Sequence, residues 1–167
     1  MTSTAAKPDR QTPRQPTPDQ EARAAQLRAA NINPRTGLAT DYLNHFNEAI
    51  MLLEMIPDMP ECAEDFLEWH PMSYAEHFTK SNFKARDLAI EAYESADEHI
   101  RAEFDNITSA MTSILTAVSE AMRDAKQDKT RATLAEQATD WVKPLVATAG
   151  GIINGGTEAD VDYIMTH

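Results

Sequence analysis

The chain has 167 residues, a length typical of a single domain with one hydrophobic core. Its composition is 42% hydrophobic and 25% charged, which excludes the fibrous, collagen-like and wholly disordered classes of protein. The formal net charge is -12, so the surface as a whole is acidic.

The charge is spread unevenly along the chain. The first 35 residues hold six basic and three acidic residues, a net charge of +3, whereas residues 36–167 have a net charge of -15. No Lys or Arg occurs between Arg35 and Lys80. Such a surface repels nucleic-acid phosphates and anionic lipid headgroups, so we expect neither a nucleic-acid nor a membrane partner. A basic partner, a cation or the chain's own basic segment would be attracted instead.

Three further features predict a cytoplasmic protein. No stretch reaches the roughly 20 apolar residues that span a bilayer, and the N-terminal residues lack the apolar segment of a signal peptide. Cys62 is the only cysteine, so the chain cannot form an internal disulfide, which agrees with a reducing compartment.

The first 35 residues divide into two predicted segments. Residues 1–16 contain three of the nine prolines and almost no large apolar side chain, which predicts a disordered arm. Residues 17–35 are expected to form a short helix and a linker. Thr17, Pro18 and Gln20 suit the cap, first and third positions of a helix over residues 18–31.

Residues 38–149 contain no glycine and no hairpin signal, which predicts helices throughout. The first core helix is expected from Thr40 or Asp41 to Ile56, and Pro57 ends it. A short acidic helix is expected over residues 60–69. The first core helix turns one apolar face to the core, formed by Tyr42, Phe46, Ala49, Leu53 and Ile56.

Two capping boxes predict the next two helices. Ser73 and Glu76 begin a helix that runs from Tyr74 to about residue 94, either unbroken or interrupted near Ser81. Ser95 and Glu98 begin the longest helix, which runs to about residue 125. Its apolar residues recur in a coiled-coil-like seam, formed by Ile100, Phe104, Ile107, Met111, Ile114, Val118 and Ala121.

The last long helix is expected over residues 129–149. Its inward residues are expected to be Leu134, Ala138, Trp141 and Leu145, and Pro144 kinks it. The pairs at 150–151 and 155–156 are glycines, which end helices, and residues 157–160 are expected to begin a small terminal helix.

These elements predict an all-α fold. Residues 36–156 are expected to form an antiparallel four-helix bundle with one extra short acidic helix, followed by a short C-terminal tail over residues 157–167.

One polar stripe on the first core helix is a candidate metal site. Asp41, His45 and Glu48 are spaced i, i+4 and i+7, so two or three of them could reach one divalent metal ion. A solvated polar face explains the same spacing and is the preferred interpretation. The Glu-x-x-His motifs of a ferritin-like centre are absent from the sequence.

The C-terminal half of the same helix is a candidate interface. Residues 49–56 are apolar on nearly every side, and Glu54 is their only charge. We expect an exposed Glu54 at the edge of this surface rather than a buried one. Met51, Leu52 and Met55 would then form an adaptable contact with a partner or a second copy of the chain.

No arrangement of residues typical of nucleophilic or acid–base catalysis is recognisable in the sequence. The leading hypothesis is therefore a non-enzymatic interaction or regulatory module without a cofactor, which binds a protein partner or forms a homodimer. The alternative is a metal-binding protein or metalloenzyme built on Asp41, His45 and Glu48.

Overall fold

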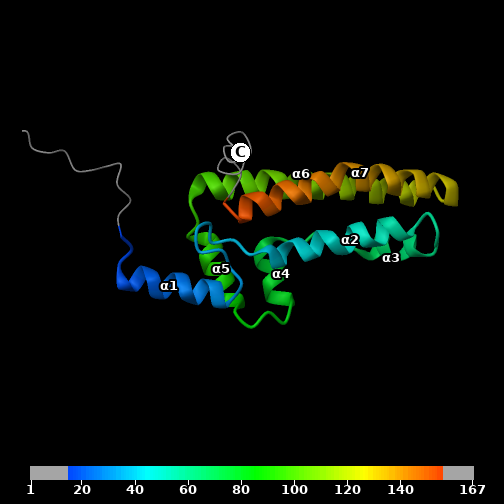
Figure 1. Cartoon of the computed structure of the whole chain (residues 1–167). Helices are drawn as coiled ribbons and strands as arrows, with labels where there is room; N and C mark the ends of the chain where they lie inside the picture. Colours follow the sequence, from blue (N-terminus) through cyan, green and yellow to red (C-terminus); the bar gives the residue numbers. More distant parts are fainter. Residues whose placement is uncertain (1–14, 156–167) are drawn as a thin grey trace, which may run out of the picture.

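The computed structural model describes residues 15–155, and these residues form seven α-helices, one short 3-10 helix and no strand (Figure 1). The all-α prediction is confirmed. The arm predicted over residues 1–16, apart from its last two residues, and the tail predicted over residues 157–167 lie outside the described range. None of the described helices is both long enough and apolar enough to span a membrane.

The helices follow one another with short connections. In chain order they are α1 (Pro18–Ala29), η1 (Thr40–Tyr42), α2 (Leu43–Met55), α3 (Cys62–Glu68), α4 (Tyr74–Lys80), α5 (Arg86–Glu94), α6 (Glu98–Asp124) and α7 (Asp128–Ile153).

The two longest helices, α6 and α7, form the main packing unit. The chain reverses over residues 125–127, so that α7 runs back alongside α6, and α2 packs against α7 (Figure 1). Helix α3 contacts both α2 and α6, while α4 packs against α5 and η1. The core between these helices is filled by wholly buried side chains, among them Phe46, Phe66, Phe78, Phe104, Met111, Leu115, Met122 and Ile153.

Arg131 stabilises the turn between α6 and α7. Its guanidinium group donates hydrogen bonds to the main-chain carbonyls of Met122 and Ala125, at 2.8–3.1 Å. These are among the last carbonyls of α6, which lack partners within the helix. A cation is also favoured there by the helix dipole. A buried charge at the start of α7 therefore holds the end of α6 in place.

Helix α1 begins as predicted but lies at the side of the molecule. Its capping box is complete, because the Thr17 hydroxyl accepts a hydrogen bond from the Gln20 amide and the Gln20 side chain accepts one from the Thr17 amide. Leu27 is its only buried residue, and Arg23 pairs with Glu91 of α5 at 2.7 Å. The helix ends at Ala29, two residues before the predicted end.

The expected helix over residues 74–94 is interrupted. Ser73 and Glu76 form the predicted capping box, but Ser81 adopts extended backbone and ends α4. Residues 81–85 then connect α4 to α5. Phe83 lies in this connection and packs against the core, with its ring centroid 5.0 Å from that of Phe78. The connection is therefore held by side-chain packing and not by a continuous helix.

The capping box predicted at Ser95 is wrong. Asp97 caps α6, with Oδ1 accepting hydrogen bonds from the amides of His99 and Ile100. Ser95 instead ends α5, and its hydroxyl donates to the Glu91 carboxylate at 2.9 Å. Helix α6 thus begins two residues later than the spacing of Ser95 and Glu98 indicates.

The buried face of α6 is broader than the predicted seam. Phe104, Met111 and Val118 are buried as expected, but Ile107 and Ile114 are only half-buried. The places next to them are filled instead by Thr108, Leu115, Ser119 and Met122. The physical reason is that α6 packs against α3 as well as against α7, so its buried face extends beyond the seam of a single helix pair.

Two predictions for α7 are also wrong. Trp141 is 56% exposed rather than inward-facing. The helix continues through Gly150 and Gly151 to Ile153, because Ile152 and Ile153 are buried. The hydroxyl of Thr36 donates to the Ile153 carbonyl at 2.6 Å and thereby satisfies one of the carbonyls at the helix end.

Candidate functional site

The three residues of the candidate metal site lie in different surroundings. Asp41 belongs to η1 and is half-buried, His45 lies on α2 and is buried, and Glu48 of α2 is exposed. Within residues 15–155, no group of three or more His, Cys, Asp or Glu side chains is placed to hold a metal ion. The metal hypothesis stays a prediction.

His45 acts as a hydrogen-bond acceptor in the interior. Its Nε2 accepts a hydrogen bond from the Met72 amide at 3.0 Å, and its ring stacks on Trp69 with centroids 4.6 Å apart. Burial, helped by the neighbouring His77 and His70, lowers the pKa of His45 to about 4. The neutral imidazole therefore anchors the connection between α3 and α4.

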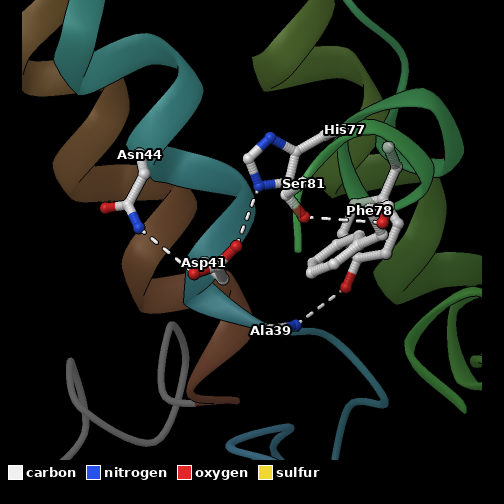
Figure 2. Close-up of polar contacts among 7 residues, drawn as sticks. Ala39, Asp41, Asn44, His77, Phe78 and Ser81 are labelled. Atoms are coloured by element: carbon white, nitrogen blue, oxygen red, sulfur yellow. Dashed lines mark hydrogen bonds and ion pairs between the residues drawn. The ribbon is translucent and has the colours of Figure 1, made fainter. Parts of the chain in front are cut away.

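Asp41 has a partner that sequence spacing did not indicate. Its Oδ2 lies 2.9 Å from Nε2 of His77 on α4, and its Oδ1 accepts a hydrogen bond from Asn44 at 3.2 Å (Figure 2). His77 is 36 residues further along the chain, so no local periodicity connects the two. The pair joins η1 to α4.

Of the four predicted interface residues, Met51 and Glu54 lie where α2 meets α7, and Leu52 and Met55 do not line that surface. Met51 is 53% exposed, whereas Leu52 and Met55 are half-buried and pack against the core. Glu54 is exposed, as preferred from the sequence, and pairs with Lys143 of α7 at 2.7 Å. This pairing raises the pKa of Lys143 above its ordinary value through the hydrogen bond and the charge of Glu54.

A cleft of about 390 Å³ opens beside Met51. Its apolar lining comes from both helices, with Ile50 and Met51 on α2 and Val146 and Ala147 on α7. Asn47 and the Glu54–Lys143 ion pair supply its polar edge. We call this surface, lined by those residues, the α2–α7 cleft.

A second cavity, of about 590 Å³, was not predicted from the sequence. It lies between α6 and the residues that begin α4, and Tyr42, Tyr74, Tyr93 and Phe104 line it. We call it the tyrosine groove. Its polar lining includes the carboxylates of Glu76 and Asp105 and a row of hydroxyl residues on α6, formed by Thr108, Ser109, Thr112 and Ser113.

The three tyrosine hydroxyls of this groove have fixed partners. Tyr42 donates to the Met72 carbonyl at 2.6 Å, and Tyr93 donates to Oδ1 of Asp105 at 2.7 Å. The Tyr74 hydroxyl accepts from the Ala39 amide at 2.9 Å. Burial raises the pKa of all three, that of Tyr42 to about 12, so the hydroxyls are protonated at neutral pH.

Both carboxylates of the groove act on Tyr42. After burial, the charges of Asp105 and Glu76 are the next causes of the raised pKa of Tyr42. Hydrogen bonds from the Ser73 backbone and side chain hold the pKa of Glu76 below its ordinary value. The groove is therefore a site of negative potential, and its described lining contains no Lys, Arg or His.

Sequence reasoning could not have found this groove. Tyr42, Glu76, Tyr93 and Asp105 come from four separate elements, and the one motif among them, the capping box of Glu76, indicates a helix start and not a groove. The only local signal is the row of hydroxyl residues at 108, 109, 112 and 113, whose spacing places them along one side of a helix.

Comparison with known proteins adds no relative: no protein-family model matches the chain, and no significant match was found among the curated proteins or the solved structures.

Proposed function

We propose that the protein is a non-enzymatic helical interaction module that docks a second copy of itself at the α2–α7 cleft. The observation that carries this proposal is the 53% exposure of Met51 beside a cleft with an apolar lining. We also interpret α2, α6 and α7 as helices of the antiparallel four-helix bundle expected from the sequence, with α3 as the extra short helix, whereas α4 and α5 pack on each other and lie across the direction of these helices (Figure 1).

The chemistry of the cleft suits a protein surface. Methionine is flexible and polarisable, so Met51 can adapt to an apolar side chain inserted from a partner. Asn47 and the Glu54–Lys143 pair surround the apolar lining with polar groups, as in interfaces that have an apolar centre and a polar rim. The two opposite charges also allow a second copy to form reciprocal ion pairs.

Other helices of the chain cover most of the apolar surface of α2, but Met51 is left exposed. Helices α7 and α3 pack against α2, and Ala49, Ile50, Leu53 and Ile56 are buried by this packing. Helix α1 is another segment of the chain that could cover this surface. It is instead held to α5 by the Arg23–Glu91 pair, so a second chain is the proposed cover.

The test is the molar mass in solution. We expect the unmodified chain to be a dimer at about 100 μM by light scattering, well above the Kd of a stable interface. Met51→Lys places a charge in the interface and should give a monomer of unchanged helicity by circular dichroism. Met55 is left unaltered because it packs against the core, where a lysine would damage folding.

Met59→Lys is the matched control. Met59 is 42% exposed and does not line the α2–α7 cleft, so the same substitution there should leave the dimer intact. A monomeric unmodified chain at about 100 μM would contradict self-association. Equal loss of the dimer in both variants would show that the cleft is not the contact.

A further inference from the structure

We infer that the tyrosine groove is a binding site for an alkylammonium group, carried by a free amine or by a lysine side chain. The groove and the α2–α7 cleft share no lining residue, so the two proposals stand independently. A volume of about 590 Å³ lies within the range of roughly 300–1,000 Å³ typical of small-molecule sites.

The aromatic rings supply the first element of cation recognition. Tyr74 stacks on Tyr93 with centroids 4.5 Å apart, and Tyr42 lies 5.1 Å from Tyr74 and 6.1 Å from Phe104. The faces of such rings are electron-rich and attract a cation that lies within about 6 Å of the centroid. The hydrogen bonds of the three hydroxyls hold the rings in place before any ligand arrives.

Tyr93 already interacts with one cation of the chain. The guanidinium carbon of Arg101 lies 5.9 Å from the centroid of its ring. Arg101 is not part of the groove lining, because its guanidinium group is directed to the carbonyl of Glu94, at 2.8 Å. The ring of Tyr93 thus already interacts with a cation outside the groove, and Arg101 itself does not line the groove.

The carboxylates supply the second element. Asp105 on α6 and Glu76 on α4 line the groove together, and no basic residue of the described chain lines it with them. Attraction between these charges and a cation is stronger in a partly enclosed site than in free solution. The acidic sequence around the groove adds a long-range attraction of the same sign.

The hydrogen bonds of these carboxylates favour an ammonium over a guanidinium group. Tyr93 already donates to Oδ1 of Asp105, and the Ser73 amide donates to Oε1 of Glu76 at 2.9 Å. Each carboxylate thus has one oxygen engaged, which disfavours the paired contacts that a planar guanidinium makes. A compact ammonium needs single contacts, and the hydroxyls of α6 can accept its other N–H bonds.

Isothermal titration calorimetry on the full chain tests this inference, at about 0.15 M ionic strength to screen contacts with the outer surface. The probes are 1,4-diaminobutane, N-acetyl-lysine methylamide and N-acetyl-arginine methylamide. We expect saturable binding of the two ammonium probes and weaker binding of the arginine probe. Tighter binding of the diamine assigns the site to free amines, and equal or tighter binding of the lysine probe assigns it to a lysine side chain.

Three variants separate the groove from general surface charge. Asp105→Asn and Glu76→Gln remove a charge but keep the oxygen that accepts from Tyr93 or Ser73, so the fold is preserved. Each should weaken ammonium binding by about fivefold or more. Glu103→Gln removes the same charge from an exposed position of α6 outside the groove and should change binding by less than about twofold.

Three results would overturn the inference. One is no saturable binding of either ammonium probe up to about 10 mM, weaker than any specific site. The second is an equal effect of Glu103→Gln and Asp105→Asn, which would assign binding to the acidic surface in general. The third is tighter binding of the arginine probe, which would contradict the ammonium assignment.

Discussion

At the residue scale, the buried His45 makes the free energy of unfolding depend on pH. Its pKa is lowered to about 4 in the folded chain, against about 6.5 in an unfolded one. Between these values the unfolded chain binds more protons, so stability is complete above about pH 6.5 and falls as the pH decreases towards 4. Glu76 opposes this effect weakly, while His77 and His70 add to it. The full loss is on the order of 3 kcal/mol.

The measurement is the free energy of unfolding in denaturant between pH 4 and pH 7, for the unmodified chain and for His45→Gln. Glutamine retains an acceptor for the Met72 amide but does not titrate. Carboxylates also titrate in this range, so the informative quantity is the difference between the two proteins. That difference should shrink as the pH falls towards 4. Parallel curves would contradict the assignment of this pH dependence to His45.

The residues of the candidate sites were only partly predictable. Met51 and Glu54 are exposed as the sequence indicated, but Leu52 and Met55, which were expected on the same surface, are half-buried and pack against the core. Spacing could not indicate that Asp41 pairs with His77, or that Tyr93 pairs with Asp105. These contacts depend on how separate helices pack against one another, and the spacing of residues within one helix does not determine that packing.

At the scale of the elements, local signals located most helices but misplaced several ends. The capping boxes at Thr17 and Ser73 are present because their side chains and the following backbone lie within one turn. At Ser95 the sequence offers an equally good box, but Ser95 is the C-cap of α5 and Asp97 is the N-cap of α6. The glycines at 150 and 151 failed as a stop signal because burial of Ile152 and Ile153 outweighs the low helix propensity of glycine.

The continuation of α7 through these glycines gives the second prediction. A Cβ atom added at Gly151 would meet no atom within 4 Å, so alanine fits there without a clash. Gly151→Ala should raise the free energy of unfolding by about 0.5–1 kcal/mol, because alanine favours the helix and restricts the unfolded chain. Denaturant unfolding monitored by circular dichroism measures the change.

Gly37 provides the contrast for this experiment. It has a φ of +75°, and an added Cβ would lie 2.8 Å from the Ala92 carbonyl oxygen. Gly37→Ala should therefore lower stability by more than about 1 kcal/mol. A neutral or destabilising Gly151→Ala would contradict the helical conformation of residues 150–153.

At the scale of the whole molecule, the basic segment over residues 1–35 contacts the acidic remainder of the chain through α1. Arg23 pairs with Glu91, and Leu27 and Ile32 are buried against the remainder of the core. The anchorage of the N-terminal region described by the structure thus depends on a few side chains between residues 23 and 32. The residues before Thr17 contribute almost no large apolar group that could add to it.

This division gives the last prediction. Deleting residues 1–16 retains Thr17 as the cap of α1 together with Arg23, Leu27 and Ile32, so the thermal midpoint should be nearly unchanged. Deleting residues 1–32 removes Arg23 and two buried apolar side chains and should lower the midpoint clearly. Differential scanning calorimetry of both truncations measures the contrast. A fall of more than about 8 °C for the shorter deletion, equivalent to over 2 kcal/mol in a domain of this size, would instead show that residues 1–16 dock on the domain.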